Sequence, residues 1–191
     1  MAVNLMYHRA QFCPEDEVRL IERAKTNPEN FAPLYNKYYE PILRYVFKRV
    51  DEEEIAYDIT SMVFIKAIQS LPKYEYRGVP FASWLFRIAK SELYQSFRDA
   101  KARRTVSIDT VVVGQFFEDM QEDVTEANRD RLLKAMSKLK ENQLQLIEMR
   151  FFEKRSFKEI GDILEMTENN AKVKTFRALA KLKEIFKVIK V

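Results

Sequence analysis

The sequence predicts an all-α fold of two small helical domains, and three observations support this prediction. Apolar residues recur three and four positions apart along most of the chain, which is the spacing of helices that bury one face. Only three glycines occur in 191 residues, which disfavours a sheet-rich fold with many tight turns. The composition changes twice, so we expect an N-terminal helical bundle over 1–104, a flexible acidic linker over 105–128 and a C-terminal helix-turn-helix domain over 129–191.

The N-terminal domain is expected to begin with a short helix and to continue with three longer amphipathic segments. Pro14 suits the first turn of the short helix, because the first N–H groups of a helix have no partner within it. The apolar stripe of 31–50 runs past Pro41, and the stripe of 59–71 ends before a proline, which cannot continue a helix. A polar loop precedes a fourth stripe that begins at Phe81. These stripes can bury one another in a helical bundle.

The predicted linker is marked by its charge. Between 105 and 128 there are six acidic residues and no basic one. The three valines before Gly114 could form a short strand, although extended chain that packs on another surface suits them better. An acidic segment of this kind does not favour contact with DNA.

The C-terminal domain ends in two helical segments separated by a short break at 165–167. Ser156, with Glu159 three residues later, forms a capping box that starts the first of these helices, and Thr167 is a candidate N-cap of the second. The second helix is rich in cations and carries two asparagines in its N-terminal half; among these residues are Asn169, Asn170, Lys172, Lys174, Arg177, Lys181 and Lys183. Two helices joined in this way, with the second strongly basic, form a helix-turn-helix pattern.

The basic helix suits duplex DNA. Long cationic side chains neutralise phosphates, and asparagine, lysine and arginine can also read base edges in the major groove. The alternative is a solvated basic face on an ordinary helical hairpin, and the spacing alone leaves both interpretations open.

The loop over 73–81 interleaves aromatic and cationic residues and lies next to Trp84, Arg87 and Lys90. This mixture suits single-stranded nucleic acid, because unpaired bases stack on rings while cations follow the backbone. The alternative places Phe81 and Trp84 in the core and uses the loop tyrosines as anchors. We favour the binding role for Tyr74, Tyr76 and Arg77.

For two further surfaces, the sequence does not decide between a structural role and a binding role. The basic run from Arg98 to Arg104 is either a solvated helix end or a set of phosphate contacts. One helix of the N-terminal domain exposes a mixed polar and apolar face, which is either plain surface or the docking site of a partner. That face consists of Asp58, Ser61, Met62 and Ile65.

Several classes of function are disfavoured by the composition. One cysteine, Cys13, and one histidine, His8, cannot form an internal disulfide or supply the roughly four ligands of a structural zinc site. The glycines stand too far apart for a phosphate-cradling loop. We therefore expect no cofactor, no metal and no enzymatic activity. The chain lacks the apolar run of a signal peptide or a membrane span, so we expect a cytoplasmic protein.

Two other classes of protein remain to be compared with the nucleic-acid-binding interpretation. A stand-alone repressor or activator would bind duplex DNA by itself, usually as a dimer on a palindrome, but nothing in the sequence resembles a ligand pocket or a dimerising coiled coil. An enzyme with a carboxylate-based site is the second rival, although no pair of acidic residues is singled out by its setting.

Two groups of motifs give the chain a resemblance to the sigma-70 family of bacterial RNA polymerase sigma factors. Those similar to the second conserved region of the family are Phe31-x-x-Leu34-Tyr35-x-x-Tyr38, Asp58-Ile-Thr-Ser-Met-Val-Phe64 and Phe81-Ala-Ser-Trp84-Leu85-Phe-Arg87-Ile88-Ala89. Those similar to the fourth are Leu146-Ile-Glu-Met-Arg-Phe, Ser156-Phe-Lys-Glu159-Ile160-Gly and Lys172-Val-Lys-x-x-Arg177-Ala178-Leu179. The likeness covers about 15–104 and 129–187 with no third-region domain between them, which resembles the extracytoplasmic-function (ECF) group.

Some positions depart from the usual pattern of that family. Ser61 and Met62 stand where the family usually has glutamine and glutamate. Within the helix-turn-helix, Gly161 replaces a usual alanine, Ala171 replaces a common valine, and Glu165 stands where the turn glycine is expected. A residue other than glycine in a left-handed turn costs roughly 1 kcal/mol, so Glu165 predicts a turn geometry that differs from the usual one of the family.

The resemblance implies a protein that binds core RNA polymerase, directs it to particular promoters and helps to open the DNA, without covalent chemistry of its own. The −35 element would be read as duplex by Asn170, Lys172, Val173, Lys174, Phe176 and Arg177. The melted −10 element would be held by Tyr74, Tyr76, Arg77, Gly78, Trp84, Arg87 and Lys90. Docking on core polymerase would use Asp58, Ser61, Met62 and Ile65. The acidic linker would suit a positively charged channel of the polymerase, and the resemblance leaves an anti-sigma partner open.

Overall fold

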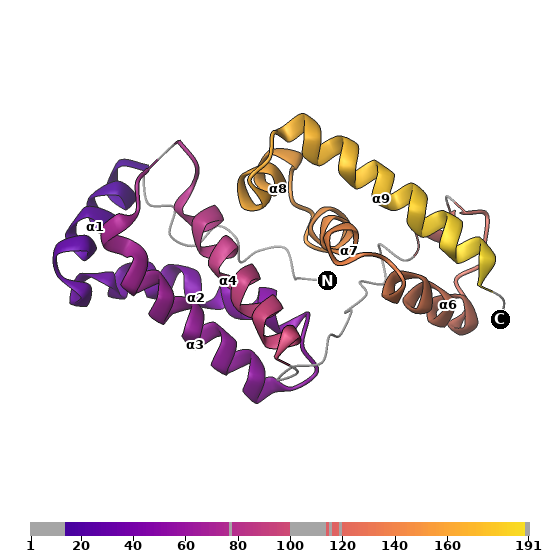
Figure 1. Ribbon diagram of the computed structural model, residues 1–191, viewed down its shortest axis with the longest axis horizontal. Helices are drawn as coiled ribbons and strands as arrows, with labels where there is room; N and C mark the ends of the chain where they lie inside the picture. Colours follow the sequence, from indigo (N-terminus) through magenta and orange to yellow (C-terminus); the bar gives the residue numbers. More distant parts are fainter. Residues whose placement is uncertain (1–13, 77, 100–113, 115, 119, 190–191) are drawn as a thin grey trace, which may run out of the picture. The chain divides into compact units, whose positions relative to one another are not determined.

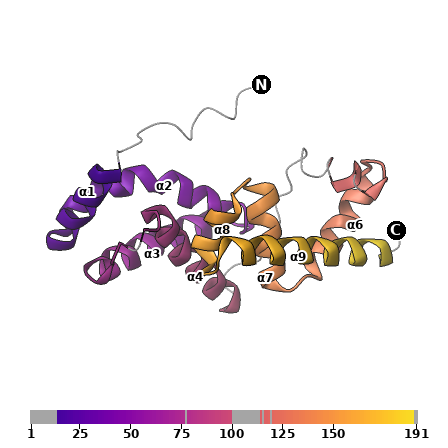
Figure 2. The same cartoon turned by 90° about the horizontal axis from the view of Figure 1, so that it is seen from above.

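The structure is a computed structural model that describes residues 14–76, 78–99, 114, 116–118 and 120–189. It divides into two compact units, 1–105 and 106–191. All the secondary-structure elements in the described part of the chain are helical, as Figures 1 and 2 show. The predicted all-α fold with two helical domains is thus confirmed. None of the helices in these described residues is long and apolar enough to cross a membrane.

The N-terminal unit contains four α-helices and two short 3-10 turns in its described residues. They are α1 (Pro14–Thr26), η1 (Pro28–Phe31), α2 (Ala32–Phe47), α3 (Glu53–Ser70), η2 (Leu71–Lys73) and α4 (Phe81–Arg98). Helix α3 packs against both α2 and α4. The core between these helices is made of apolar side chains such as Leu34, Ile42, Val63, Leu85 and Leu93, which are almost fully buried.

Helix α2 runs through Pro41 without interruption. An internal proline removes one helical hydrogen bond and costs about 3 kcal/mol. Tyr38 and Ile42, on either side of it, are both buried, as are Tyr45 and Val46 one turn later. Burial of this apolar stripe offsets the local cost, since each fully buried large apolar side chain contributes about 1.5–3 kcal/mol.

Helix α1 is linked to α2 by hydrogen bonds to the half-buried carboxylate of Glu17. Glu17 Oε1 accepts a hydrogen bond from Lys37 Nζ at 2.6 Å and another from the Tyr38 hydroxyl. Ile21 and Ala24 are buried on the inner side of α1. The helix opened by Pro14 is therefore an integral part of the N-terminal unit.

The C-terminal unit is built from four α-helices within its described residues. They are α6 (Glu126–Ser137), α7 (Glu141–Ile147), α8 (Phe157–Leu164) and α9 (Glu168–Val188), and a π turn, η3 (Glu148–Phe152), extends α7. Helix α9 packs against α6, α7 and α8. Leu132, Met136, Leu144, Leu182 and Phe186 are among the buried residues of its core.

Part of the segment expected to be a linker belongs to this C-terminal core. Phe117 is 0% exposed and Phe116 is also buried, and their ring centroids lie 5.8 and 5.4 Å from that of Phe186. Arg131 lies over the Phe186 ring and donates hydrogen bonds to the carbonyl oxygens of Phe186 and Ile189. The predicted linker over 105–128 therefore extends too far toward the C-terminus. The charged residues of this stretch are all acidic, and that signal gives no indication that its two adjacent phenylalanines are core residues.

Several features discussed above lie outside the described residues. They are His8, Cys13, Arg77, the valines at 111–113, and Lys101, Arg103 and Arg104 of the basic run.

Candidate nucleic-acid interface

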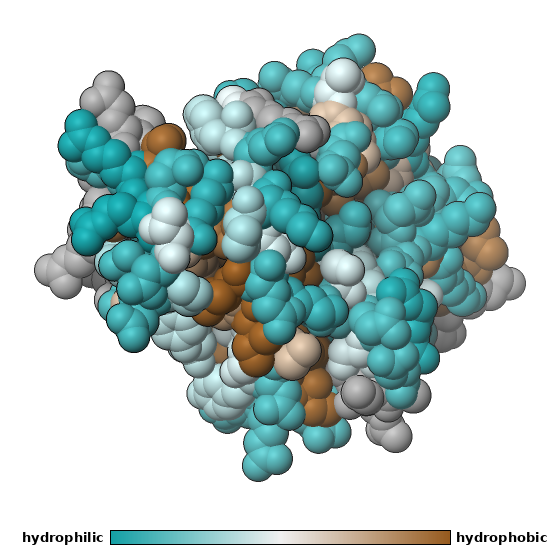
Figure 3. Space-filling model, turned by 60° about the vertical axis from the view of Figure 1, so that its left-hand side comes forward, coloured by the Kyte–Doolittle hydropathy of each residue, from teal (hydrophilic) through white to brown (hydrophobic). Residues whose placement is uncertain are grey.

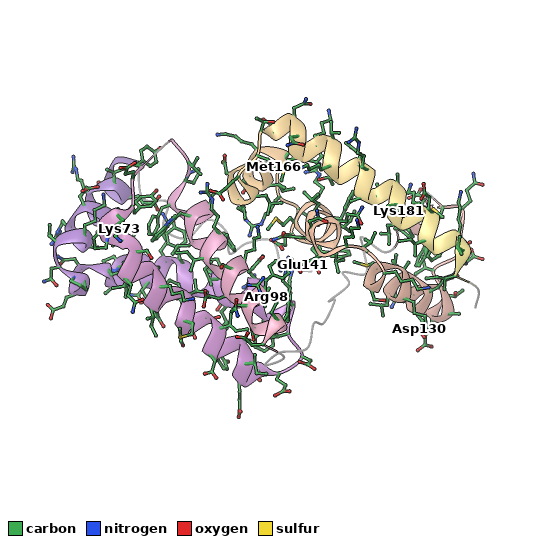
Figure 4. All side chains as sticks on the ribbon, viewed as in Figure 1. Lys73, Arg98, Asp130, Glu141, Met166 and Lys181 are labelled. Carbon is green, nitrogen blue, oxygen red and sulfur yellow. The ribbon has the colours of Figure 1, made fainter. Side chains whose placement is uncertain are left out.

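The two helices of the helix-turn-helix begin at the predicted caps. The backbone N–H of Glu159 donates to Ser156 Oγ at 3.1 Å, and the Ser156 N–H donates to Glu159 Oε2 at 2.8 Å, which completes the capping box. The N–H of Asn170 donates to Thr167 Oγ1 at 3.3 Å at the start of α9. Both caps satisfy N–H groups that would otherwise lack partners at a helix start. Figure 4 labels Met166, in the turn between α8 and α9, and Lys181, further along α9.

The turn between the helices is left-handed without a glycine at its centre. Glu165 has φ 56° and ψ 48°, and the next residue, Met166, donates its N–H to the carbonyl of Gly161 at 2.9 Å. A Cβ on Gly161 would lie only 2.6 Å from the Met166 carbonyl oxygen. The unusual residues at 161 and 165 therefore belong to one local arrangement, in which glycine on α8 lets the turn approach closely.

Helix α9 separates a buried side from an exposed one. Ala171, Thr175 and Ala178 face the core, and the Thr175 hydroxyl is satisfied because it donates to the Ala171 carbonyl at 2.7 Å. Leu179 is half-buried. All six residues predicted to read duplex DNA are exposed, namely Asn170, Lys172, Val173, Lys174, Phe176 and Arg177. The structure thus brings these six together on one accessible side of the helix.

The residues of the loop before α4 that were predicted to bind the melted −10 element differ in their exposure. Tyr74 is buried, with its ring 5.3 Å from that of Phe81 and 4.8 Å from that of Trp84. Burial is the main cause that raises its pKa above the usual tyrosine value. Both core aromatics thus pack against the Tyr74 ring, and Phe81 is buried as the alternative proposed. The part of Tyr74 in −10 binding stays a prediction.

Other residues of this region are accessible. Tyr76 is 57% exposed, and Gly78 is exposed with a φ of 73°, a conformation that side chains rarely adopt. Trp84, Arg87 and Lys90 are half-buried along α4. The accessible ring of Tyr76 and the glycine beside the loop leave space where an unpaired base could stack.

The predicted docking residues share the exposed side of α3. Asp58, Ser61, Met62 and Ile65 are all exposed, whereas the opposite side, including Phe64, is buried. Figure 3 shows hydrophobic side chains exposed in patches among hydrophilic ones on one face of the molecule.

Three aromatic residues on α2 and α3 are exposed, although the sequence pattern did not single them out as surface residues. They are Tyr35, Phe47 and Tyr57, and the last two lie with ring centroids 6.4 Å apart. The Tyr57 hydroxyl donates to Glu53 Oε1 at 2.9 Å, and this hydrogen bond is the main cause that raises its pKa. Helical periodicity alone does not distinguish such exposed aromatic residues from core residues.

Comparisons with known proteins match both halves of the chain. Residues 34–103 match the family model of sigma-70 region 2, and residues 135–184 match that of sigma-70 region 4. The chain is 27% identical over 181 residues to the ECF RNA polymerase sigma factor BldN of Streptomyces coelicolor, covering 92% of this chain and 69% of that protein. It is 24% identical over 155 residues to the ECF sigma factor SigM of Bacillus subtilis, covering 80% of this chain and 93% of that protein.

A solved structure has a similar fold. It contains the sigma factor RpoE of Bartonella quintana in complex with the anti-sigma factor NepR. It aligns with a TM-score of 0.53 and 18% sequence identity over 85% of this chain and 99% of that one.

Proposed function

The chain belongs to the sigma-70 family of RNA polymerase sigma factors, in its ECF group, and from this premise we propose that it binds core RNA polymerase, directs it to specific promoters and promotes opening of the DNA. The observation that carries the proposal is the presence of both family regions, in order, each in its own folded unit. Sigma factors are not catalytic enzymes, and we assign no covalent reaction to this chain.

Reconstitution with core polymerase tests this function. The full-length protein, mixed with core enzyme and a library of promoter fragments, should yield transcripts that start at a restricted set of promoters. Core enzyme alone is the control and should not select them. A protein that bound duplex DNA tightly without polymerase, and added no promoter selection to it, would instead be a stand-alone regulator.

The C-terminal unit would read the −35 element. Its basic helix, α9, exposes Lys172, Lys174 and Arg177 in its N-terminal half. Recognition helices contact base edges mainly through their N-terminal residues. Phosphate contacts from the lysines would fix the register, and base contacts would supply sequence preference.

The N-terminal unit would hold the melted −10 element with the loop before α4. Stacking of one base on an aromatic ring contributes about 1–3 kcal/mol, which is similar to the cost of unstacking a base. Tyr76 supplies the exposed ring, Gly78 permits close approach, and Tyr74 supports the loop from beneath. Arg77, Trp84, Arg87 and Lys90 complete the proposed −10 surface.

Exchange of this loop tests the −10 assignment. When residues 74–79 are replaced by the corresponding loop of another ECF sigma factor, the preferred −10 base should change and the −35 preference should not. Transcription in vitro from promoters varied at each −10 position measures both. An unchanged −10 preference would make the loop a connector and move the pocket to the helix that carries Trp84.

Docking on core polymerase would use the exposed side of α3. Met62 and Ile65 offer exposed apolar groups, of which methionine is enriched in protein interfaces, and Asp58 and Ser61 place polar groups beside them. Because sigma factors act on RNA polymerase in the cytoplasm, we place this chain there as well. An anti-sigma factor is a further candidate partner, and purification of the tagged protein from its own cells would identify one.

A further inference from the structure

The exposed side of α9, the proposed recognition helix, contains two apolar side chains among its cations. Val173 is 39% exposed and Phe176 is 51% exposed, although both lie on the helix with the largest share of exposed lysine and arginine in the C-terminal unit. Burial does not account for their identity, because the core of this unit is contacted instead by Ala171, Thr175 and Ala178 on the opposite side. Core packing therefore does not explain why apolar residues occupy these two exposed positions of the helix.

The two apolar residues lie in the middle of the exposed side, with a lysine on each flank. At 3.6 residues per turn, or about 100° per residue, Val173 and Phe176 lie about 60° apart around the helix axis. Lys172 lies about 40° beyond Phe176 and Lys174 lies about 100° beyond Val173, so that the two lysines are separated by about 200° across the apolar pair. Arg177 lies next to Val173 on the same side.

This order of side chains around the helix axis suits a helix that lies in a major groove. Long cationic side chains on the two flanks reach the phosphates on either wall, while the residues between them face the base edges. The only apolar group on those edges is the C5-methyl group of thymine. A polar base edge covered by an apolar side chain would lose its hydrogen bonds to water without replacement, which costs free energy.

Phe176 is held in place before it meets a ligand. Its ring lies 5.9 Å from that of Phe157 on α8, and the guanidinium of Arg150 lies 4.5 Å from the centroid of the Phe157 ring. This aromatic pair limits the directions in which Phe176 can point. A side chain that is already oriented loses less conformational entropy on binding.

We propose that Val173 and Phe176 recognise thymine methyl groups in the −35 element, so that the preferred element has thymine at neighbouring positions facing this pair. The proposal rests on the proposed function and adds the base that the helix prefers. Lys172 and Lys174 contact the flanking phosphates, and Arg177 contacts a base beside the thymines.

The test removes the methyl group and nothing else. Holoenzyme, formed from the full-length chain and core polymerase, first selects its preferred −35 sequence from fragments randomised there. Each thymine of that element is then replaced singly by deoxyuridine, and holoenzyme binding is compared for the two DNAs. Burying one CH2 group contributes about 0.8 kcal/mol, so loss of a contacted methyl group should weaken binding about fourfold.

The protein variants show which side chain makes the contact. With Phe176→Ala or Val173→Ala, the ratio of binding to thymine and deoxyuridine DNA should fall to about one at the position that each side chain contacts. Leu133→Ala, which removes a side chain that is 38% exposed on α6, is the matched control and should keep the fourfold ratio. The far-ultraviolet circular dichroism of each variant checks that the helices remain folded.

The outcomes separate this proposal from the proposed function. If promoter-specific transcription occurs but the selected −35 element lacks thymine, or the fourfold ratio survives both substitutions, the methyl contact is overturned and the apolar pair belongs to a protein interface instead. If core polymerase gains no promoter selection from the chain, the proposed function itself fails.

Discussion

Gly161 and Glu165 show how two residues can depend on one another at the scale of a single turn. The left-handed conformation of Glu165 brings the Met166 carbonyl oxygen to where a Cβ of residue 161 would lie, 2.6 Å away. A side chain at 161 would force the turn or the helix to move. The left-handed turn that sets the path from α8 into α9 therefore requires a residue without a side chain at position 161.

This arrangement predicts opposite effects of two substitutions. Glu165→Gly should stabilise the C-terminal unit by about 1 kcal/mol, because glycine adopts a left-handed conformation without the steric cost. Gly161→Ala should destabilise it, since the added methyl group collides with backbone. Urea unfolding followed by circular dichroism measures both changes. Gly114→Ala is the control, because a Cβ there has open space around it, and an equal loss in both alanine variants would contradict the explanation.

A second prediction at this scale concerns Tyr38 and alkaline pH. Burial is the main cause that raises its pKa far above the usual value of about 10, and its hydrogen bond to Glu17 adds to the effect. The unfolded chain therefore releases this proton at a lower pH than the folded one. Stability that is present below about pH 10 should be lost as the pH rises above it.

The variant Tyr38→Phe isolates this contribution. It should be less stable than the native protein at pH 8 by about 0.5–1.5 kcal/mol, because one hydrogen bond is removed. It should also lose stability less steeply between pH 9 and 11. Urea unfolding across that range provides both comparisons, and parallel curves for the two proteins would show that Tyr38 does not cause the alkaline loss.

At the scale of elements, both units include segments beyond the residues that match the family models. Helix α1 precedes residue 34, yet it packs against η2, and Lys25 Nζ lies 5.9 Å from the centroid of the Tyr74 ring. The segment around Phe117 precedes residue 135, yet it lies in the core next to Phe186. Each unit thus completes its core with residues just outside the matched region.

The core position of Phe117 predicts a large effect on stability. Phe117→Ala should destabilise the C-terminal unit by about 3–5 kcal/mol, as expected when a fully buried phenylalanine is truncated. Thermal unfolding of the full-length protein measures this loss. Val124→Ala, at an exposed apolar residue only seven positions later, should change stability little. If both substitutions had small effects, Phe117 would not be a member of this core.

At the scale of the whole molecule, the two proposed interactions belong to different units. The exposed side of α3 lies in the first unit and the recognition helix lies in the second. Because each unit has its own core, a surface substitution in one should not alter the fold of the other. Binding to polymerase and reading of the −35 element should therefore be lost separately.

Two surface substitutions test this separation. Asp58→Arg should abolish co-purification with core polymerase, because it reverses a charge in the proposed docking surface, while Asp130→Arg on α6 is the matched control. Arg177→Ala should leave polymerase binding intact but weaken and relax −35 recognition, by about 1–3 kcal/mol if it contacts a base. Pull-down assays and transcription in vitro measure the two properties. Undiminished polymerase binding by Asp58→Arg would remove α3 from the docking surface.

Local features of the chain were predictable from the sequence alone. Helical periodicity, the capping box at Ser156, the cap at Thr167 and the exposed cations of α9 were all predicted and are present in the structure. Each depends on residues within one or two helical turns of each other, and such local features can be predicted from the sequence. The likeness of the motifs to the sigma-70 family indicated the function in the same way.

Contacts between distant residues were decided only by the tertiary structure. Tyr74 is buried because Phe81 and Trp84 pack against it, and Phe117 is core because Phe186, far along the chain, lies beside it. Pro41 stays within α2 because the burial of its apolar neighbours outweighs the unfavourable free energy of a proline inside a helix. In each case the burial free energy depends on partners that come together only in the folded chain, so neither periodicity nor charge within a short window could reveal it.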